Sequence, residues 1–423
     1  MKNKMVSNLK KYPAYKGSGI EWIGEIPEHW NKSKLKYGLK KKITDGPHET
    51  PIFIDEGIPF LSVDGIQDGE LIFEGCRFVS TKEHNRFSQK CNIEKDDILM
   101  GKAASIGKIA RVKVDFEFSV WSPLALIKPK KEKVLPIFLE FALKSAETQY
   151  QIEILCTSNT QKNISMDDIP HIILLFPPID EQQAIADYLD KKTALIDKLI
   201  DKKKQQIELL KEQRQAVINQ VVTKGLDPDV EMKESGIEWL GKIPKHWDAK
   251  KLKYVITIKS GDGVSNENIH SEGEYPIYGG NGLLGYTNDF NVDGDTLVVG
   301  RVGAKCGNVH LVRGKYWVSD NALVTKTTQD YEFMYFLLTS MNLNNLANQN
   351  AQPLITATMV KLQYVALPDG VEQVEIVKHL KLELTKIQEA EDRAKKQIHL
   401  LQEYRTALIS EAVTGKIDVR REN

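Results

Sequence analysis

Glycine-spaced loops hold most of the side chains in this sequence that could carry out specific chemistry. Arg and Lys match guanine edges and phosphates, whereas Asn and Gln match adenine edges. Glycine lets a backbone approach such a ligand closely. Taken together the loops indicate contact with DNA, although any single residue could belong to an ordinary surface loop. The candidate side chains are His48, Thr50, Lys102, Ser105, Lys108, Asn159, Gln161, Lys162, Asn281, Arg301, Lys305, Asn308 and Gln352.

The strings that mark common enzyme active sites do not occur in this sequence. It has no P-loop, HExxH or GxSxG string and no methylase-type Asn/Asp-Pro-Pro-Tyr tetrapeptide. A GxGxxG string runs from Gly280 to Gly285, but neither a buried strand before it nor a helix after it is indicated. This string predicts a turn, with a nucleotide site as the alternative. We expect no catalytic residue, no metal and no cofactor on this chain.

The charge balance argues against a protein that binds nucleic acid by charge alone. The 423 residues include 58 Lys and Arg and 58 Asp and Glu, which gives a formal net charge of zero. A DNA reader with a locally positive surface is still compatible with this balance. Lysines cluster between Lys32 and Lys42 and between Lys250 and Lys259, where a solvated face and phosphate contact are both open.

The cysteines and the apolar runs indicate a cytoplasmic protein. The cysteines stand at positions 76, 91, 156 and 306 without any CxxC pair, so reduced thiols are expected. No run of 18 apolar residues and no secretory apolar region occurs, so we expect neither a membrane span nor a signal peptide.

One segment occurs twice and sets the organisation of the chain. Residues 16–37 and 233–254 share 15 of 22 positions, including the string GIEW-x-G-x-IP-x-HW. Residues 207–214 similarly match residues 398–405. Such repeats predict a tandem duplication with a period near 200 residues. The histidines and tryptophans of the repeat are expected to pack or cap structure and not to catalyse.

Two diverged globular regions follow the two copies of this segment. Ser122–Leu126 aligns with Ser319–Leu323, and Phe138 aligns with Phe333. The first region carries extra residues, mostly before position 97. We predict four segments: a first domain at 16–178, a long helix at 179–225, a second domain at 226–369, and a second long helix at 370–416. The expected fold class is α+β, with two mixed domains and a pseudo-twofold arrangement.

The two long helices each carry a heptad seam. Apolar residues recur with alternating steps of 3 and 4, which is typical of a coiled coil. About 43 helical residues would span roughly 65 Å. We favour an antiparallel pair, which would place one domain at each end of a rod, and a parallel pair is the alternative. The apolar seam residues are Leu189, Ile196, Ile200, Ile207, Leu210, Val217, Leu380, Leu384, Ile387, Ile398, Leu401 and Leu408.

Several strings, taken in order, resemble the specificity (S) subunit of type I restriction–modification systems. The resemblance covers nearly the full length. The strings that carry it are the twice-used opening, DGPHETP (45–51), GIPFLSV (57–63), YPIYGGNGLLGY (275–286), GDTLVVGRVGAKCGNV (294–309), SDNALV (319–324) and the two P-x-x-x-EQ helix starts (177–182, 368–373).

This resemblance implies two target-recognition domains on an antiparallel coiled coil. Each domain would read one half of a split, asymmetric DNA site, and the helices would set the gap. Two adenine methyltransferase (modification) subunits and restriction/translocase subunits would dock on the framework, and would hold S-adenosylmethionine, ATP and Mg. The alternative is a coiled-coil scaffold that spaces two protein-binding domains. The target bases, the gap length and the activity of the host system stay open.

Overall fold

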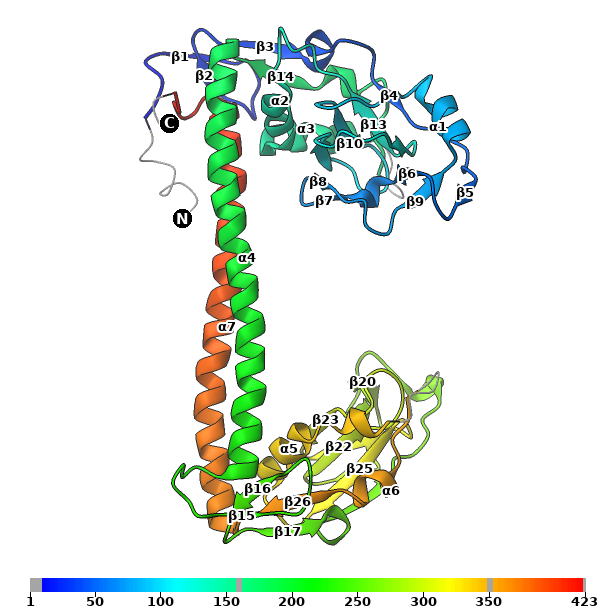
Figure 1. Ribbon diagram of the computed structural model, residues 1–423, viewed down its shortest axis with the longest axis vertical. Coiled ribbons are helices and arrows are strands. Elements are labelled where there is room, and N and C mark those ends of the chain that lie inside the picture. Colours follow the sequence, from blue (N-terminus) through cyan, green and yellow to red (C-terminus); the bar gives the residue numbers. More distant parts are fainter. Residues whose placement is uncertain (1–9, 157–161, 348–352, 421–423) are drawn as a thin grey trace. The chain divides into compact units, whose positions relative to one another are not determined.

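The structure, a computed structural model, describes residues 10–156, 162–347 and 353–420 (Figure 1). The chain divides into two compact units. The first unit holds residues 1–203 and 396–423, and the second unit holds residues 204–395. Each long helix therefore contributes one part to each unit. Each unit also contains a mixed domain of helices and strands, so the predicted fold class is confirmed.

The repeated opening segment folds in the same way in both units. Its first strand pairs with its second, and its third pairs with the strand that comes just before a long helix. In the first unit the pairs are β1 (Tyr15–Gly17) with β2 (Glu25–Pro27) and β3 (Asn31–Lys34) with β14 (Ile173–Phe176). In the second unit they are β15 (Met232–Glu234) with β16 (Lys242–Pro244) and β17 (Asp248–Lys251) with β26 (Tyr364–Leu367). Both ends of each globular domain are thus joined beside the start of a helix.

The first domain contains two four-stranded sheets. Their strand orders are β11-β10-β13-β4 and β12-β6-β9-β5. The strands are β4 (Thr44–Asp45), β5 (Phe53–Ile54), β6 (Ile58–Leu61), β9 (Arg77–Val79), β10 (Ile98–Gly101), β11 (Ile109–Arg111), β12 (Ser119–Val120) and β13 (Leu124–Ile127). A hairpin of β7 (Ile66–Gln67) and β8 (Glu70–Leu71) and helix α1 (Thr81–Ser88) also lie before residue 97.

The second domain repeats the two sheets with fewer additions. Their strand orders are β23-β22-β25-β18 and β20-β19-β24-β21. The strands are β18 (Ile256–Ser260), β19 (Tyr275–Gly279), β20 (Gly282–Thr287), β21 (Val292–Asp293), β22 (Thr296–Gly300), β23 (Val309–Val312), β24 (Lys315–Val318) and β25 (Ala322–Thr327). Among the described elements of this domain, none corresponds to the β7–β8 hairpin or to α1, which agrees with the extra residues expected in the first domain.

Short helices cover one face of the first sheet in each domain. Helix α2 (Pro136–Lys144) packs on β11, and α5 (Tyr331–Ser340) packs on β23. Phe138 and Phe333, which the sequence aligned, are both fully buried there. The remaining short helices are α3 (Ala146–Leu155), α6 (Ala357–Lys361), η1 (Leu35–Gly38), η2 (Val63–Gly65), η3 (Ile169–His171), η4 (Leu252–Tyr254), η5 (Asn266–Asn268) and η6 (Leu343–Leu346).

One alignment made from the sequence is wrong by a single residue. The sequence paired Ser122 with Ser319, but the backbone of Trp121 takes the place of Ser319. Leu124 N donates to the Trp121 carbonyl, and Ala322 N donates to the Ser319 carbonyl. The shared Ser and Ala-Leu letters misled the alignment. Since successive strand side chains face opposite sides, a slip of one residue exchanges the two faces.

The long helices α4 (Ile179–Lys224) and α7 (Gly370–Val413) run antiparallel within each unit. In the first unit Arg405 Nε donates to Asp197 Oδ1 over 2.9 Å. In the second unit Arg214 Nη2 donates to Gln388 Oε1 over 2.8 Å. Within the first unit Arg420, beyond the end of α7, also reaches Glu181 at the start of α4. Within the second unit Gly225, just after α4, lies beside Glu372 at the start of α7. In each unit residue numbers therefore fall along α7 as they rise along α4, which confirms the antiparallel pairing and excludes the parallel alternative.

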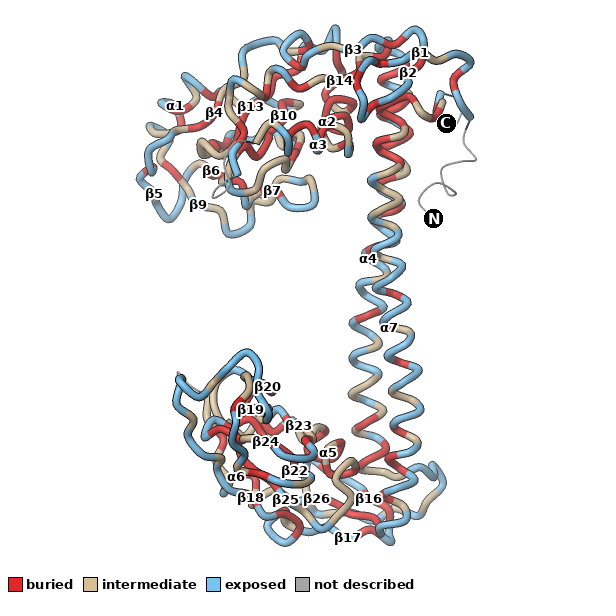
Figure 2. The backbone as a smooth tube through the Cα atoms, turned by 180° about the vertical axis from the view of Figure 1, so that it is seen from behind, coloured by how far each residue is buried: buried red, intermediate tan, exposed pale blue. Residues whose placement is uncertain are grey.

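The burial along both helices follows the seam that the heptads predicted (Figure 2). All twelve apolar seam residues named from the sequence are buried or half-buried. Leu189 and Leu380 contribute to the cores that also hold the sheet residues of the first and second unit, respectively. Each helix pair is therefore continuous with the core of the domain beside it.

A clasp between the repeated His-Trp pair and a helix glutamate holds each opening segment. In the first unit Trp30 Nε1 donates to Glu181 Oε2 over 2.9 Å, and His29 Nε2 lies 2.7 Å from Glu181 Oε1. In the second unit Trp247 Nε1 and His246 Nε2 lie 3.0 and 2.9 Å from Glu372 Oε2. Both tryptophan side chains are fully buried. This clasp explains why the HW and EQ strings occur twice.

The glutamine after each clasp glutamate ties the helix to the globular domain. Gln182 Oε1 accepts from Leu135 N, which precedes α2, and Gln373 Oε1 accepts from Asp330 N, which precedes α5. Their amides donate to the carbonyls of Pro177 and Pro368. Each Glu-Gln pair thus joins three parts of the fold at one helix start.

Replacement of Glu181 by alanine should cost more stability than replacement of Glu372. Glu181 is the more buried of the two and also accepts from Arg420. A buried donor left without an acceptor costs about 1–3 kcal/mol. We expect a loss of about 3 kcal/mol for Glu181→Ala and about half of that for Glu372→Ala, measured by denaturant unfolding, with exposed Glu389→Ala as the control. Equal losses in the two variants would contradict this account.

Candidate nucleic-acid interface

In the first domain the structure brings the loops after β4 and β10, which carry predicted side chains, together at Lys102. Lys102 follows β10, and its ammonium nitrogen lies 3.2 Å from Asp45 Oδ2 at the end of β4. Its carbonyl accepts a hydrogen bond from Ile164 N, two residues beyond the predicted contact Lys162. The backbone of the loop after β4 is fixed as well, because Ser122 N donates to the Pro47 carbonyl. The loop after β4, the loop after β10 and the chain at Ile164 therefore meet at the ends of these strands.

Asp45 is the electrostatic centre of this surface. Besides Lys102, its carboxylate is bonded by Lys90, and His48 Nε2 lies 3.0 Å from Oδ2. Burial by itself would raise the pKa of Asp45, but the hydrogen bonds from Lys90 and Lys102 outweigh it, so the pKa is lowered. Lys102 and Asp45 are both buried, whereas His48 and Lys90 are exposed. The pair is therefore a structural ion pair beneath a more exposed rim.

In the second domain Arg301 occupies the place of Lys102. Arg301 N donates to Asn321 O and its carbonyl accepts from Ile355 N, as Lys102 does with Pro123 and Ile164. The glycine before each cation also makes the same bond, to a carbonyl at the far end of the loop that follows. Gly101 N donates to Lys108 O, and Gly300 N donates to Asn308 O. The cation at the end of this strand is therefore the same position in both copies.

Ser260 takes the place of Asp45 beside this second cation. Leu124 and Ala322 are equivalent, because each is in register with the glycine before the cation. The next residue, Ala125 or Leu323, is in register with Asp45 in the first domain and with Ser260 in the second. Arg301 Nη1 donates to Ser260 Oγ over 3.0 Å and to the Asp320 carbonyl over 3.2 Å. Residue 260 thus anchors Arg301 by a hydroxyl where residue 45 neutralises Lys102 by a carboxylate.

The two equivalent cations therefore differ in what they can offer a ligand. Lys102 is 8% exposed and its charge is balanced by Asp45. Arg301 is half-buried, and among the described residues no carboxylate lies within ion-pair distance of it. A guanidinium with spare donors can bind a guanine edge or a phosphate. Of the two cations, Arg301 is therefore the one with donors free for an external ligand.

The glycine string of the second domain forms part of the same surface. Gly280 and Asn281 form the turn between β19 and β20, so the string makes a hairpin, as expected from its turn-like residues. A Cβ on Gly300 would lie only 2.6 Å from the Gly280 carbonyl oxygen. The absence of a side chain thus allows this turn to touch the Arg301 loop.

The other predicted side chains differ in how far they are exposed. Thr50, Asn281, Lys305 and Asn308 are exposed, and Ser105 and Lys108 are half-buried. Lys162 is exposed, but its ammonium nitrogen lies 3.3 Å from Glu153 Oε1. Asn159, Gln161 and Gln352 lie outside the described residues. Contact of any of these residues with DNA stays a prediction.

Three residues that shape the surface were not among the predicted contacts. Asp45 lies in the DGPHETP string but was not named among the candidate side chains. Lys90 reaches Asp45 from the end of α1, and no sequence pattern connects it to the loop. Ser260 lies in no recognised string. Ser260 could have been identified only from the register of β18 against β25, in which Ser260 lies opposite Leu323.

No alternative site of other chemistry stands out in the described parts of the chain. Residues 10–156, 162–347 and 353–420 contain no group of three or more His, Cys, Asp or Glu side chains that could hold a metal ion. Over the same ranges, no helix combines the length and the apolar character of a membrane span.

Solved structures share this architecture. A chain of a type I R-M system, solved in a study of complex assembly and conformational transition, matches with a TM-score of 0.69, covering 92% of this chain and 98% of that chain at 14% identity. The HsdS subunit from Thermoanaerobacter tengcongensis matches with a TM-score of 0.50 at 13% identity, covering 93% and 98% of the two chains. At these identities the likeness shows the fold.

Sequence relatives identify the family. The family described as "Type I restriction modification DNA specificity domain" matches residues 30–209 and 244–399. The putative type I restriction enzyme MjaX specificity subunit of Methanocaldococcus jannaschii is 25% identical over 94% of this chain and 96% of that protein. The EcoprrI specificity subunit of Escherichia coli is 36% identical over 110 residues, which span 25% of this chain and only 27% of that protein. The chain belongs to the family of type I restriction–modification specificity subunits.

Loss of the Lys102 side chain should affect folding more than loss of the Arg301 side chain. Lys102→Ala leaves buried Asp45 with fewer partners, and removing one partner of a buried ion pair costs about 3 kcal/mol or more. We expect about 3 kcal/mol for Lys102→Ala and less than about 1 kcal/mol for Arg301→Ala, measured by denaturant unfolding. Lys108→Ala is the control within the same loop. The assignment fails if Lys102→Ala unfolds at the wild-type denaturant concentration.

The lowered pKa of Asp45 should make the first domain sensitive to acid. A carboxyl group whose pKa is lower in the folded state contributes stability above its ordinary pKa and loses it as the pH falls through the folded pKa. The stability difference between wild type and Asp45→Asn should therefore be constant from pH 7 to 5 and shrink below about pH 4. Unfolding titrations at several pH values measure it, with exposed Asp55→Asn as the control. A difference that grows on acidification would refute the lowered pKa.

Proposed function

We propose that this chain reads a bipartite DNA site, with one domain for each half-site. The observation that carries the proposal is the same strand end in both domains, bordered by glycine-spaced polar loops. In the second domain it carries Arg301 with spare donors, and in the first it carries the ion-paired Lys102 beneath an exposed rim. The backbone around this position is the same in both domains, while the side chains differ. Such a pair of surfaces suits two different half-sites read in the same manner.

The long helices would set the gap between the two half-sites. An antiparallel pair joins the start of each helix to its own domain, and 46 residues of α4 correspond to roughly 69 Å of helix. Two separate half-sites would provide specificity without one large interface, because each mismatched base pair costs about 1–3 kcal/mol.

The repeated framework would dock the catalytic partners. Trp22 and Trp239 are equivalent residues of the repeat, and both are exposed. Tyr37 and Tyr254 are likewise equivalent and exposed. Core packing does not explain identical exposed aromatic residues in two copies, but two copies of one partner would. We infer that two modification subunits bind here and that restriction subunits join them.

The chemistry of the system would reside on those partners. Adenine methylation with S-adenosylmethionine and ATP- and Mg-dependent cleavage belong to the modification and restriction subunits in this proposal. The specificity chain itself would contribute binding alone. Its formal net charge of zero suits this role if the partners supply much of the phosphate contact.

Arg301→Ala should relax the recognition of one half-site only. The measurement is base-resolution mapping of methylated adenines in host cells that carry the wild-type or the variant gene. We expect unchanged bases in the half read by the first domain and tolerated mismatches in the other half, with a salt slope of DNA affinity lowered by about one in the assembled methylase. Lys326→Ala, on β25 of the same domain, is the matched control.

Two further outcomes decide against the proposal. If deletion of the gene leaves the methylation pattern of the host unchanged, the chain does not confer DNA specificity. If Arg301→Ala and exchange of residues 38–178 leave DNA affinity untouched while partner assembly fails, the two domains bind proteins and the chain is a scaffold.

A further inference from the structure

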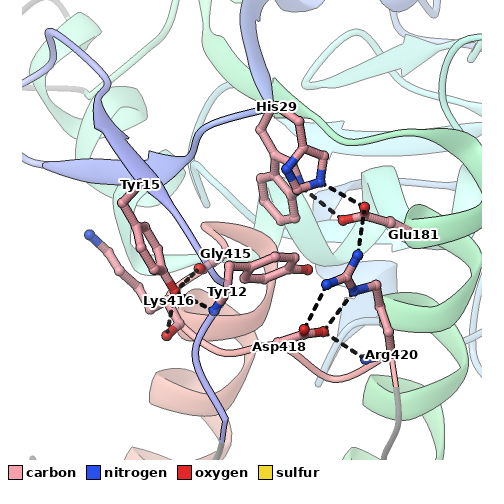
Figure 3. A network of polar contacts seen from close by, with 9 residues as sticks. Tyr12, Tyr15, His29, Glu181, Gly415, Lys416, Asp418 and Arg420 are labelled. Carbon is pink, nitrogen blue, oxygen red and sulfur yellow. Dashed lines mark hydrogen bonds and ion pairs between the residues drawn. The ribbon is translucent and has the colours of Figure 1, made fainter.

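The C-terminal segment of the first unit places an arginine beside the His-Trp clasp (Figure 3). Arg420 donates from Nε and Nη2 to the two oxygens of Asp418 over 2.8 and 2.7 Å. Its Nη1 donates to Glu181 Oε1 over 3.3 Å, and its guanidinium lies 4.7 Å from the centre of the Tyr12 ring. The pKa of Arg420 is raised, first because Asp418 accepts its hydrogen bonds. Two carboxylates and a ring thus form a guanidinium site.

The second unit builds the same two carboxylates without the arginine. Glu372 corresponds to Glu181, because each accepts from the Trp and His of its own clasp. Asp227 corresponds to Asp418 in the repeated ends of the long helices. Asp229 N donates to Asp227 Oδ1 over 2.9 Å, just as Arg420 N donates to Asp418 Oδ1 over 3.2 Å. Asp229 therefore stands where the first unit has Arg420.

A cavity of about 380 Å³ lies at this position in the second unit. Asp227, Asp369, Glu372 and Glu375 line it, and His246 and Val371 complete part of its wall. Among the described residues that line it, the one ammonium group belongs to Lys224, which donates to the carbonyls of Leu240 and Lys242. The cavity is thus rich in carboxylates where the first unit holds a cation.

Glu372 has an oxygen left for such a cation. His246 and Trp247 both bond to Oε2 of Glu372. In the first unit the clasp uses both oxygens of Glu181, and Oε1 also accepts from Arg420. Among the described residues, Glu372 Oε1 has no hydrogen-bond donor, and a Cβ on Gly225 would lie 3.2 Å from it. The acceptor that binds Arg420 in one copy therefore lies open in the other.

We propose that this cavity of the second unit binds an arginine side chain of a protein partner. The planar guanidinium can bind both oxygens of one carboxylate in parallel and reach a second carboxylate, as Arg420 does in the first unit, whereas an ammonium group lacks this planar fork. In the first unit the ligand is an arginine carried on a chain segment, and a partner segment would supply the same group here. Val371 is 72% exposed at the rim and would contact the apolar stem of that arginine. The site makes the two ends of the repeated framework unequal for binding.

The test uses the indole N–H of Trp247 as the reporter, since it donates to Glu372. N-acetyl-arginine amide is titrated into the full chain labelled with ¹⁵N at tryptophan, and N-acetyl-lysine amide and NaCl serve as controls. We expect a saturating shift of the Trp247 resonance with the arginine probe. The Trp30 resonance should stay in place, because Arg420 already occupies its site. Equal shifts with NaCl, or no shift of Trp247, would overturn the proposal.

Two variants test the assignment by filling the site of the second unit and emptying the site of the first. Asp229→Arg supplies the missing arginine within the chain and should abolish the Trp247 response to the probe, whereas Asp229→Asn should keep it. Arg420→Ala empties the site of the first unit and should make Trp30 respond. A Trp247 response that persists in Asp229→Arg would show that the probe binds elsewhere and would overturn the assignment.

A last arm tests the source of the arginine and rests on the proposed function, since it uses the modification subunit. In the assembled complex Trp247 should no longer respond to the arginine probe. Asp229→Arg should weaken assembly at least tenfold, and Asp229→Asn should not. Unchanged assembly with a responsive Trp247 would overturn the assignment to a partner's arginine. Failure of wild-type chain and modification subunit to assemble at all would instead contradict the proposed function.

Discussion

The hydrogen bonds between each His-Trp pair and the glutamate at a helix start hold the architecture together. Trp30 and Trp247 are fully buried and need an acceptor for their indole N–H, and Glu181 and Glu372 supply it. The glutamine next to each glutamate binds the globular domain. One Glu-Gln dipeptide therefore joins the opening segment, the globular domain and the long helix. These shared contacts account for the near identity of the His-Trp and Glu-Gln strings in the two copies, whereas the domains differ.

The two domains differ most in side chains at the loop ends of their sheets, away from the repeated opening segment and the long helices. The strand that carries Lys102 or Arg301 keeps its backbone hydrogen bonds, but the neighbour of the cation is Asp45 in one domain and Ser260 in the other. A buried carboxylate turns a cation into a structural ion pair, and a hydroxyl leaves the guanidinium with donors to spare. The neighbouring side chain thus decides whether the cation at this position stabilises the fold, as Lys102 does, or is available for the proposed recognition, as Arg301 is.

The sequence predicted the elements with strong periodicity and missed details that depend on register. The heptad residues from Leu189 to Leu408 are buried or half-buried as expected, because each seam position repeats many times and one error changes little. The short strands gave too few residues for such averaging, so Ser122 was aligned one residue away from its true counterpart. The role of Lys102 as an ion-pair partner was missed for a related reason, since Asp45 is 57 positions away in the chain.

The sequence by itself determined the duplication, the two domains, the long helices and the family, because these depend on repeated letters and on apolar spacing. Tertiary structure decided the antiparallel direction of the helices, the balance of charge around Lys102 and Arg301, and the unequal surroundings of Glu181 and Glu372. These properties arise where segments distant in the chain meet. Whether a carboxylate is paired depends on which side chain lies across from it in the fold, and no local pattern in the sequence identifies that neighbour.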